Sequence, residues 1–485
     1  MHHEKVRYIY LILFLLFSLT QILFANTPDT IWTKSYGSVE LDYLNSISLT
    51  EDNCIIGVGF SRHCDENYCA WMFKSSSDGD LIWSKYYDFG YMTFFEDVIC
   101  LPDTTFLVLG TYSPSYYSYF DIILIKMNAF GDTLWMRNIG GAEGRSIKLT
   151  QENELINLGL GFRENFGSDV YLVKTSLIGD TIWTKTYGGS KDEYPEKLET
   201  TSDDGYIIIS TSRSFGNKKI YLIKTDSYGD TLWTKLYNPL YDNEGKSVKE
   251  TLDGGLLIVG FGRKEEVSQY SSAIIIRTNS SGDTIWTRII EDDYYNNLED
   301  ILVLSDTTYI LAGGTGSYGA QVGDFWMLKI NDHGDLIWNK IVGGHNYDMA
   351  MAIIEHYDGT YIIGGNTYSY GAGDQDAWLV NLDTVGFSHI TEPFVEQDIF
   401  FITQNYPNPF NAVTTIRYAV GTPGKVELSI YNLLGQKVAT LVNDSKPAGN
   451  YTVNWDASGF SSGIYYCVLR TGENLVQTRK MVLLK

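Results

Sequence analysis

The sequence predicts an all-β protein, a seven-bladed β-propeller closed by an N-terminal strand and followed by a small immunoglobulin-like β-sandwich. Two observations predict the propeller. A phrase of the form Gly-Asp-x-x-Trp recurs about every fifty residues, and the segments between its copies are short, strand-length and bounded by turn residues. Such a period is typical of repeats that pack on their neighbours. The tryptophans of the phrase and of its degenerate first copy are Trp32, Trp83, Trp135, Trp183, Trp233, Trp286 and Trp338.

The N-terminus is expected to be a secretory signal peptide over residues 1–25. Lys5 and Arg7 precede an apolar run over residues 8–19, and Ala25 stands before the polar Asn26. This order of charge, apolar run and small residue is the layout of a cleaved export signal. A retained membrane anchor is the alternative, which is disfavoured because polar residues interrupt the run before it is long enough to span a bilayer.

The propeller is expected over residues 26–386, with four short strands in each unit. Six complete units lie between Asp42 and Trp338, and a seventh set of three strands begins at Asp348. The first copy of the phrase, Thr30-Ile31-Trp32, is predicted to pair as the missing outer strand of that set. An apolar second strand in each unit indicates a sheet buried on both faces. Crowding near the propeller axis explains the small residue where this strand ends, at Gly59, Gly110, Gly159, Ser210, Gly260, Gly313 and Gly365.

Composition excludes several classes of function. The formal net charge of -23 argues against nucleic acid and anionic lipid as partners, since both require clustered Lys and Arg. Neither a metal-ligand spacing nor a hydrolase, phosphate-loop or dinucleotide motif occurs, so we expect no metal, no cofactor and no enzymatic activity. Cys64 and Cys69 share one loop, where they either form a disulfide or remain free thiols.

Candidate binding residues are expected on one face of the propeller. The loops from the outer strand to the next inner strand, and those from the second to the third strand, leave the sheets on the same face. Aromatic platforms beside carboxylate acceptors suit sugars. Two alternatives stay open, because repeated acids also accept backbone hydrogen bonds in turns or hold a cation. The acids are Asp42, Asp97, Glu143, Asp192, Glu244, Asp300 and Asp348, and the rings are Tyr112, Tyr116, Tyr117, Phe166, Tyr318, Tyr368 and Tyr370.

After Asp383 the repeat stops. Residues 387–402 are expected to be a linker and residues 403–485 a separate domain, whose evenly spaced short strands indicate an antiparallel sandwich. Its motifs are Gln404-Asn405-Tyr406-Pro407-Asn408-Pro409-Phe410-Asn411, Tyr431-Asn432 with Gly435-Gln436, Ala448-Gly449-Asn450-Tyr451, Trp455-Asp456, Ser462-Gly463-Ile464-Tyr465 and Lys480-Met481.

This last domain closely resembles the C-terminal sorting domain of cargo of the type IX (Por) secretion system of Bacteroidota-like bacteria, because the motifs stand in the family's order. The resemblance implies export by the general secretory route, then passage through an outer-membrane translocon that reads the domain. In the family a surface sortase often removes it. Similar modules that are merely structural also occur. Cys467 is expected to act as a small buried hydrophobe. The resemblance assigns sorting to Asn405, Pro407, Asn408, Pro409, Phe410, Asn411, Gly435, Gly449, Trp455, Gly463 and Lys480.

We therefore expect a secreted or outer-membrane surface protein of a Gram-negative bacterium, with no transmembrane segment after signal cleavage. The expected role is binding or adhesion. The propeller would recognise a glycan or an envelope protein, and the tail would meet the type IX translocon and sortase. A secreted propeller enzyme, quinoprotein-like or glycan-cleaving, and a purely structural envelope protein are the alternatives. The repeated phrase is similar to the tryptophan-docking repeats of quinoproteins, but their cofactor-binding residues are not found here.

Overall fold

The computed structural model describes residues 30–64, 67–116, 118–162, 167–291, 294–317, 323–383, 401–402, 405, 408–420, 424–447, 449–471 and 475–485. The expected signal peptide and most of the expected linker lie outside these residues. The chain divides into two compact units, residues 1–389 and 390–485. In the described ranges every regular element is a β-strand. No helix in them has the length and apolar composition that crossing a membrane requires.

The first unit contains seven four-stranded antiparallel sheets, numbered here in ring order. Sheet 1 comprises β2 (Asp42–Leu49), β3 (Ile55–Cys64), β4 (Asn67–Ser75) and β5 (Leu81–Tyr87). Sheet 2 comprises β6 (Met92–Cys100), β7 (Phe106–Ser113), β8 (Asp121–Met127) and β9 (Thr133–Gly140). Sheet 3 comprises β10 (Ala142–Leu149), β11 (Leu155–Phe162), β12 (Ser168–Thr175) and β13 (Thr181–Tyr187). Sheet 4 comprises β14 (Glu193–Thr200), β15 (Tyr206–Ser212), β16 (Lys219–Thr225) and β17 (Thr231–Tyr237).

The remaining sheets follow the same order, except that the last one contains the first strand of the chain. Sheet 5 comprises β18 (Asp242–Glu250), β19 (Leu256–Arg263), β20 (Ser272–Thr278) and β21 (Thr284–Ile290). Sheet 6 comprises β22 (Asn296–Val303), β23 (Tyr309–Thr315), β24 (Asp324–Ile330) and β25 (Leu336–Val342). Sheet 7 comprises β26 (Asp348–Glu355), β27 (Tyr361–Thr367), β28 (Asp376–Leu382) and β1 (Thr30–Tyr36). The predicted pairing of the N-terminal strand with the last three strands is confirmed by the β1–β28 ladder.

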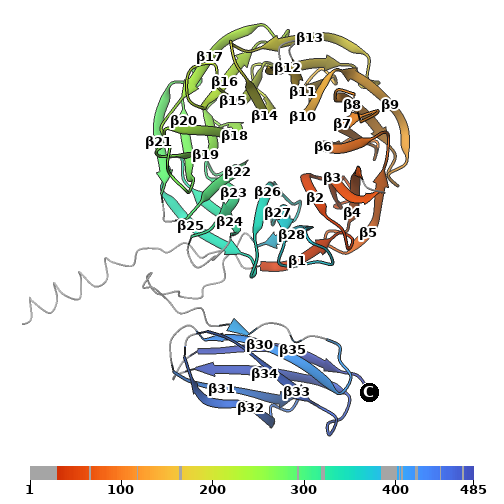
Figure 1. The fold of residues 1–485 in the computed structure, drawn as a ribbon, viewed down its shortest axis with the longest axis vertical. Coiled ribbons are helices and arrows are strands. Elements are labelled where there is room, and N and C mark those ends of the chain that lie inside the picture. The colour runs from red at the N-terminus through yellow and green to blue at the C-terminus, as the bar shows by residue number, and fades with distance from the viewer. Residues whose placement is uncertain are drawn as a thin grey trace, which may run out of the picture. The chain divides into compact units, whose positions relative to one another are not determined.

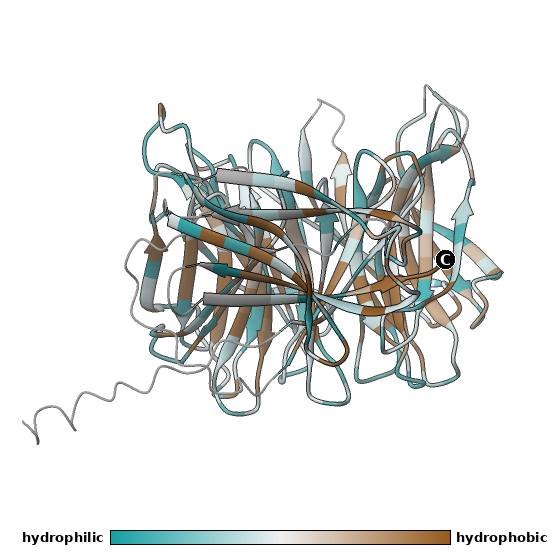
Figure 2. Ribbon diagram, turned by 90° about the horizontal axis from the view of Figure 1, so that it is seen from below, coloured by the Kyte–Doolittle hydropathy of each residue, from teal (hydrophilic) through white to brown (hydrophobic). Residues whose placement is uncertain are grey.

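The seven sheets form a ring in which the first strand of each sheet, from β2 to β26, lies innermost (Figure 1). This is the arrangement of a β-propeller. The second strands are mostly buried, and β15 and β27 are buried along their whole length, because each sheet packs a neighbour on either face. Hydrophobic segments accordingly run along the strands, whereas the connecting loops are mostly hydrophilic (Figure 2).

The Gly-Asp-x-x-Trp phrase forms the hairpin between the third and fourth strands. Gly79 and Gly131 adopt φ values of 76° and 79°, in the left-handed region that favours glycine. The amide of Gly79 donates to the carbonyl of Ser76 at 3.0 Å, which closes the turn. The phrase is therefore structural, as its turn chemistry predicts.

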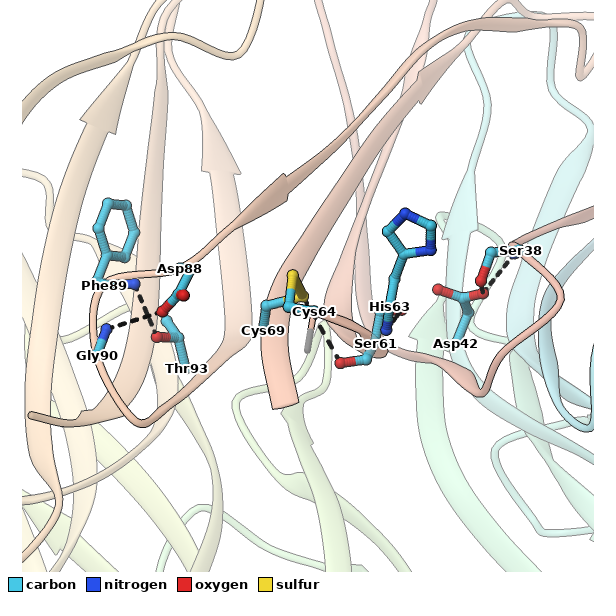
Figure 3. The surroundings of a disulfide bond; sticks show 10 residues. All are labelled: Ser38, Asp42, Ser61, His63, Cys64, Cys69, Asp88, Phe89, Gly90 and Thr93. Atoms are coloured by element: carbon cyan, nitrogen blue, oxygen red, sulfur yellow. Dashed lines mark hydrogen bonds between the residues drawn. A yellow bond between two sulfur atoms is a disulfide. The ribbon is translucent and has the colours of Figure 1, made fainter. Parts of the chain in front are cut away.

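Cys64 and Cys69 form a disulfide and are not free thiols. Cys64 is the last residue of β3 and Cys69 lies within β4, with their Cα atoms 5.9 Å apart (Figure 3). The other three cysteines are free thiols, and two of them, Cys54 and Cys467, are buried. Cys467 is 1% exposed within the core of the second unit, where burial raises the pKa of its thiol to about 12. It therefore behaves as the small hydrophobe that the sequence predicts.

The second unit contains two antiparallel sheets. One comprises β29 (Phe401–Ile402), β30 (Val413–Val420) and β33 (Gly449–Asp456), and the other β32 (Lys437–Lys446), β31 (Gly424–Asn432), β34 (Gly463–Thr471) and β35 (Leu475–Leu483). Both sheets contribute to one buried cluster that includes Trp455 and Leu428. Residues 401–402 were expected in the linker, but they pair with β30 and so belong to this unit.

Candidate functional site

The seven innermost strands enclose a central cavity of about 1270 Å³, which every sheet of the ring helps to line. Each of these strands carries a one-residue bulge at the same place. In β2, for example, Leu44 and Ser46 oppose consecutive residues of β3, so Asn45 has no partner on that strand. A bulge redirects a side chain out of the regular alternation. The bulged residues, called the bulge ring, are Asn45, Glu96, Arg145, Glu196, Lys246, Glu299 and Met351, and all of them except Met351 are polar or charged.

The bulges also explain the small residues at the end of the second strands. A Cβ on Gly59 would lie 1.8 Å from the carbonyl oxygen of Tyr43, and one on Gly313 would lie 2.0 Å from that of Asn297. These carbonyls belong to the inner strand just before the bulge. The glycines are therefore required by a close backbone approach at each bulge, which is more specific than the general crowding that the sequence suggests. Ser210 is the exception, and its buried hydroxyl has no hydrogen-bond partner among the described residues.

Charges of opposite sign alternate around the bulge ring, from Glu96 through Arg145, Glu196 and Lys246 to Glu299. Lys246 and Glu196 form an ion pair at 3.1 Å, and Arg145 pairs with Glu143 at 2.7 Å. Burial raises the pKa of Glu96 to about 7, against the attraction of Arg145. Burial likewise raises the pKa of Glu299 to about 7, against the attraction of Lys246. The cavity is thus lined by charges that are mostly compensated.

One residue further along the inner strands, Asp97 and Asp300 join sheets that are not adjacent. Asp97 accepts hydrogen bonds from Ser46 at 2.8 Å and from the amide of Ile147 at 3.0 Å, and so links sheets 1 and 3 across sheet 2. Asp300 accepts from the amide of Ile353 at 3.1 Å and pairs with Lys197 at 2.7 Å. Although burial opposes ionisation, Lys197 and Lys249 hold the pKa of Asp300 below its usual value. Both carboxylates have structural partners.

Two faces of the ring are distinguished by their loops. On the crossover face the chain passes from the fourth strand of one sheet to the first of the next, and from a second strand to a third. On the hairpin face lie the two tight hairpins of each of sheets 1 to 6 and the one hairpin of sheet 7, between β26 and β27. The lining of the cavity runs from Lys218 and Glu244 at the crossover face, an end called here the opening, to Glu250 and Glu355 at the far ends of the inner strands.

Aromatic rings, most of them half-buried, gather at the crossover-face ends of sheets 1, 2, 6 and 7. The Tyr43 ring stacks on Phe60 with centroids 5.0 Å apart, and Phe60 meets Phe94 edge-on at 5.1 Å. The Tyr43 hydroxyl donates to the sulfur of Met351 at 3.8 Å, which places this ring beside sheet 7. Burial, with Glu299 and Tyr347 nearby, raises the pKa of Tyr43 to about 12. We call these rings and their neighbours the aromatic arc, which consists of Tyr43, Phe60, Tyr68, Phe94, Phe120, Tyr295, Tyr347 and Tyr368.

Charged side chains from sheets 3 to 5 line the other side. Lys218 pairs with Glu244, and Glu143 pairs with Arg145. The guanidinium of Arg213 lies over the ring of Tyr194 at 5.6 Å, and the ammonium of Lys246 lies over Phe261 at the same distance. The opening therefore presents rings on one side and ion pairs on the other.

The structure places the predicted acids at four different positions along the inner strands, rather than in one set of loops. Asp97 and Asp300 lie inside β6 and β22, one residue beyond the bulge. Glu143 and Glu244 lie two residues before the bulge, and Asp192 precedes β14. The prediction of one acid in each loop is therefore wrong, because variable loop lengths shifted the alignment. Asp42 and Asp348 form a third equivalent pair, as the first residues of β2 and β26.

Asp42 and Asp348 are buried and accept hydrogen bonds from the preceding turn. The amide and hydroxyl of Ser38 both donate to Asp42 Oδ2 (Figure 3). Asp348 accepts from the amide of Gly344 at 2.9 Å and from the hydroxyl of Ser369 at 2.8 Å. These contacts favour the turn interpretation that the sequence left open.

The predicted rings are spread over several environments. Tyr112 is partly buried against the core of sheets 1 and 2, and Tyr116 is exposed beside Tyr91. Tyr368 lies in the aromatic arc, whereas Tyr370 packs on Trp378 at 4.9 Å and donates to the carbonyl of Gly343. Tyr117, Phe166 and Tyr318 lie outside the described residues.

Sequence reasoning missed the bulge ring and most of the aromatic arc. A usable signal was present, because two residues after each bulge stands a buried aliphatic residue and no insertion occurs between them. Alignment on this column would have placed the charged residues together. The column is Ile47, Val98, Ile147, Leu198, Val248, Ile301 and Ile353.

In the second unit, the predicted sorting residues join the start of the domain to its last strand. The amide of Phe410 donates to the carbonyl of Val482 at 2.9 Å, and the side chain of Asn408 accepts from the amide of Val482 at 2.8 Å. The rings of Phe410 and Trp455 are buried 5.5 Å apart. Gly435 takes φ 73° in the turn that follows β31, while Pro409, Asn411 and Lys480 are exposed. Asn405 donates to Thr414, Gly449 begins β33, Gly463 begins β34, and Pro407 lies outside the described residues.

Comparison with known proteins identifies the tail. Residues 404–484 match the secretion system C-terminal sorting domain. The chain is thus a secreted β-propeller protein with a type IX sorting tail, and the tail implies contact with the type IX secretion machinery. No curated protein matches the sequence.

Several solved structures resemble the chain at low sequence identity. The extracellular domain of a hybrid two-component system from B. thetaiotaomicron is 8% identical, with a TM-score of 0.44 over 95% of this chain and 57% of that one. The Dos1 propeller is 9% identical, with a TM-score of 0.44 over 73% of this chain and 94% of that one. The β-propeller domain of the Trilobed protease from Pyrococcus furiosus is 10% identical, with a TM-score of 0.43 over 72% and 95%. At these values the likeness says nothing of binding or catalysis.

Proposed function

We propose that the chain is a seven-bladed propeller over residues 26–386, closed through β1, with an immunoglobulin-like sorting sandwich over residues 403–485. The seven sheets would be its blades, and the β1–β28 ladder supports closure because it joins the two ends of the ring. Residues 1–25 would be removed during export. The sorting tail would deliver the propeller to the cell surface or beyond it.

We infer that the propeller binds a carbohydrate at the opening of its central cavity. The aromatic arc beside the charged side of that opening is the observation that supports this role. Sugar rings present CH groups that pack on aromatic faces, and hydroxyls that exchange hydrogen bonds with carboxylates and amines. Tyr43, Phe60 and Phe94 supply neighbouring faces, and the opposite ion pairs supply donors and acceptors.

A screen of the mature full-length protein against surface glycans tests this proposal. Tyr43→Ala and Phe94→Ala should each weaken the affinity for a bound glycan by about tenfold, since each removes one stacking face. Tyr228→Ala is the matched control, because its ring is 72% exposed on the hairpin face. Glycan binding that survives both changes in the arc, or falls equally in the control, would exclude this site. Binding of an envelope protein in place of any glycan would assign the same opening to a protein ligand.

Two carboxyl groups give the enzymatic alternative a specific test. Glu96 and Glu299 line the same cavity with pKa values raised to about 7, the range in which a carboxylic acid donates a proton at neutral pH. They come from sheets 2 and 6, each beside a basic residue. If a bound glycan is cleaved, Glu96→Gln and Glu299→Gln should abolish cleavage and leave binding intact; cleavage that continues in both would exclude these groups.

A further inference from the structure

The third strand of each of the first six sheets ends in a basic residue that is paired with an acid of a hairpin. In every case this cation pairs across the ladder with the tryptophan of the repeated phrase, as Lys74 does with Trp83. The pairs are Lys74–Asp52 at 2.9 Å, Lys126–Asp103 at 3.1 Å, Lys174–Glu152 at 2.9 Å, Lys224–Asp203 at 2.8 Å, Arg277–Asp253 at 2.7 Å and Lys329–Asp306 at 3.6 Å.

Sheet 7 lacks this cation. Asn381 pairs with Trp32 in β1, and so occupies the place of the six basic residues. The acid is still there, because Asp358 lies in the hairpin that corresponds to those of Asp52 and Asp203. The amide side chain of asparagine is shorter than a lysine and carries no charge. In the described part of the chain, Asp358 therefore has no lysine or arginine partner of the kind that pairs with the equivalent acid in each of the other six sheets.

A cavity of about 340 Å³ opens at this place, where sheet 7 meets sheet 1. We call it the seam cavity. Its walls include Trp32, Asp78, His356, Asp358 and Asn381. The volume exceeds that of several water molecules, at about 30 Å³ each. It therefore admits a short organic chain.

Two side chains supply acceptors to the seam cavity, Asn381 through its Oδ1 and Asp358 through its carboxylate, whose Oδ1 also accepts from the amide and hydroxyl of Thr360 at 2.9 and 2.7 Å. Asn381 is 3% exposed, and its Oδ1 accepts no hydrogen bond from any described residue. His356 Nδ1 lies 2.8 Å from Asp358 Oδ1 but is not aligned for a hydrogen bond, and its Nε2 lies 3.5 Å from the carbonyl of Asn53. A buried acceptor without a donor costs free energy, so a ligand that donates hydrogen bonds is favoured here. The indole of Trp32 adds a face that attracts cations.

We propose that the seam cavity binds an alkylammonium group, with Asp358 and the Asn381 Oδ1 as its acceptors and Trp32 at its side. The ammonium takes the place that a lysine or arginine of the chain itself fills in the other six sheets. The site lies on the hairpin face and is independent of the opening proposed to bind carbohydrate.

Titration of the full-length protein with n-butylammonium, followed by calorimetry, tests the proposal. The wild type should bind n-butylammonium saturably. It should bind neither n-butanol, which has the alkyl chain without the charge, nor sodium ion, which has the charge without the alkyl chain. Asp358→Asn should weaken binding by about tenfold or more, because a charge-assisted hydrogen bond is lost. Asn381→Lys should abolish it, since the new side chain supplies its own ammonium, and should raise the Tm.

The opposite change provides a gain-of-function control. Lys224→Asn removes the ammonium that pairs with Asp203 in sheet 4 and should create a second n-butylammonium site. Comparison of Nα-acetyllysine methylamide with glucosamine identifies the carrier, a peptide or a sugar, by the tighter binding. Absence of saturable binding in the wild type, or binding in Asn381→Lys and Asp358→Asn as tight as in the wild type, would overturn the proposal.

Discussion

The hydroxyl of Tyr36 donates a hydrogen bond of 2.7 Å to the carbonyl of Gly79, and so joins strand β1 to a hairpin of the next sheet. The same contact recurs around the ring. Lys34, two residues earlier, pairs with Asp80 of that hairpin at 2.8 Å. The repeated phrase therefore connects neighbouring sheets, a set of contacts called here the clasp. The lysine and tyrosine that follow the tryptophan on the fourth strand of one sheet bind the aspartate and the glycine carbonyl of the phrase in the next sheet. Equivalent hydroxyl contacts are Tyr87–Gly131 at 2.7 Å, Tyr187–Gly229 at 2.6 Å and Tyr237–Gly282 at 2.6 Å.

Substitution of a clasp glycine should cost more stability than its backbone conformation alone explains. A Cβ on Gly131 would lie 2.9 Å from the Trp83 ring, whereas one on Gly254, at nearly the same φ, would meet nothing within 4 Å. Gly254→Ala should lower the free energy of unfolding by about 1–2 kcal/mol through the left-handed backbone. Gly131→Ala should exceed that by about 1 kcal/mol or more, because the indole must move. Denaturant unfolding checks this, and equal losses would contradict the clasp.

Removal of residues 29–36 should lower the melting temperature sharply. The deletion strips β28 of its outer partner and removes Tyr36, which is 5% exposed and stacks on Phe73 at 4.4 Å. Burial of one such side chain alone contributes about 2–3 kcal/mol. Lys34→Ala is the control, with an expected loss below about 1 kcal/mol because its ion pair is solvent-exposed. An unchanged thermal transition in the deletion variant would refute closure through β1.

The repeats predict the strand order of the propeller, because each copy of the phrase marks one sheet. They do not predict which residues face the central cavity, because the copies differ there only in their backbone geometry. The pairing of Trp32 with the last strands follows from a missing copy of one phrase, which any alignment detects. The tryptophan spacing groups Asp97 with Asp42, although the two lie at different positions relative to the bulge. Loops of variable length separate the acids from the tryptophans that were used as markers, so spacing does not reveal the register. The bulge is marked only by the buried aliphatic residue two positions later, a column that the tryptophan spacing does not align, so that spacing does not identify Glu96 and Arg145.

The disulfide between Cys64 and Cys69 should stabilise the fold modestly. It closes a loop with a sequence separation of 5, and a loop this short corresponds to about 2 kcal/mol in the chain-entropy description. Cys64→Ser with Cys69→Ser should lower the free energy of unfolding by up to that amount. A reducing agent should destabilise the wild type to the same extent and leave the double variant unchanged. A further loss in the reduced variant would show that the effect comes from elsewhere.

Glu299 should make the protein less stable as the pH rises through the neutral range. Burial raises the pKa of this carboxyl from 4.5 to about 7 in the folded protein. Between those values the folded state holds a proton that the unfolded state has released, so ionisation on going to higher pH favours unfolding. At about 1.4 kcal/mol for each pKa unit, the difference amounts to about 3 kcal/mol at most.

Glu299→Gln isolates this contribution. The free energy of unfolding of the variant, measured relative to wild type, should rise by up to about 3 kcal/mol between pH 4.5 and pH 7.5, because glutamine cannot ionise. Its absolute stability also reflects the changed contact with Lys246, but that contact does not produce the rise over this pH range. Glu266→Gln, an exposed residue, serves as the control and should follow the wild-type profile. Parallel profiles for Glu299→Gln and wild type would mean that this carboxyl ionises as readily in the cavity as in water, and that the lining of the cavity is wetter than its charge pairs indicate.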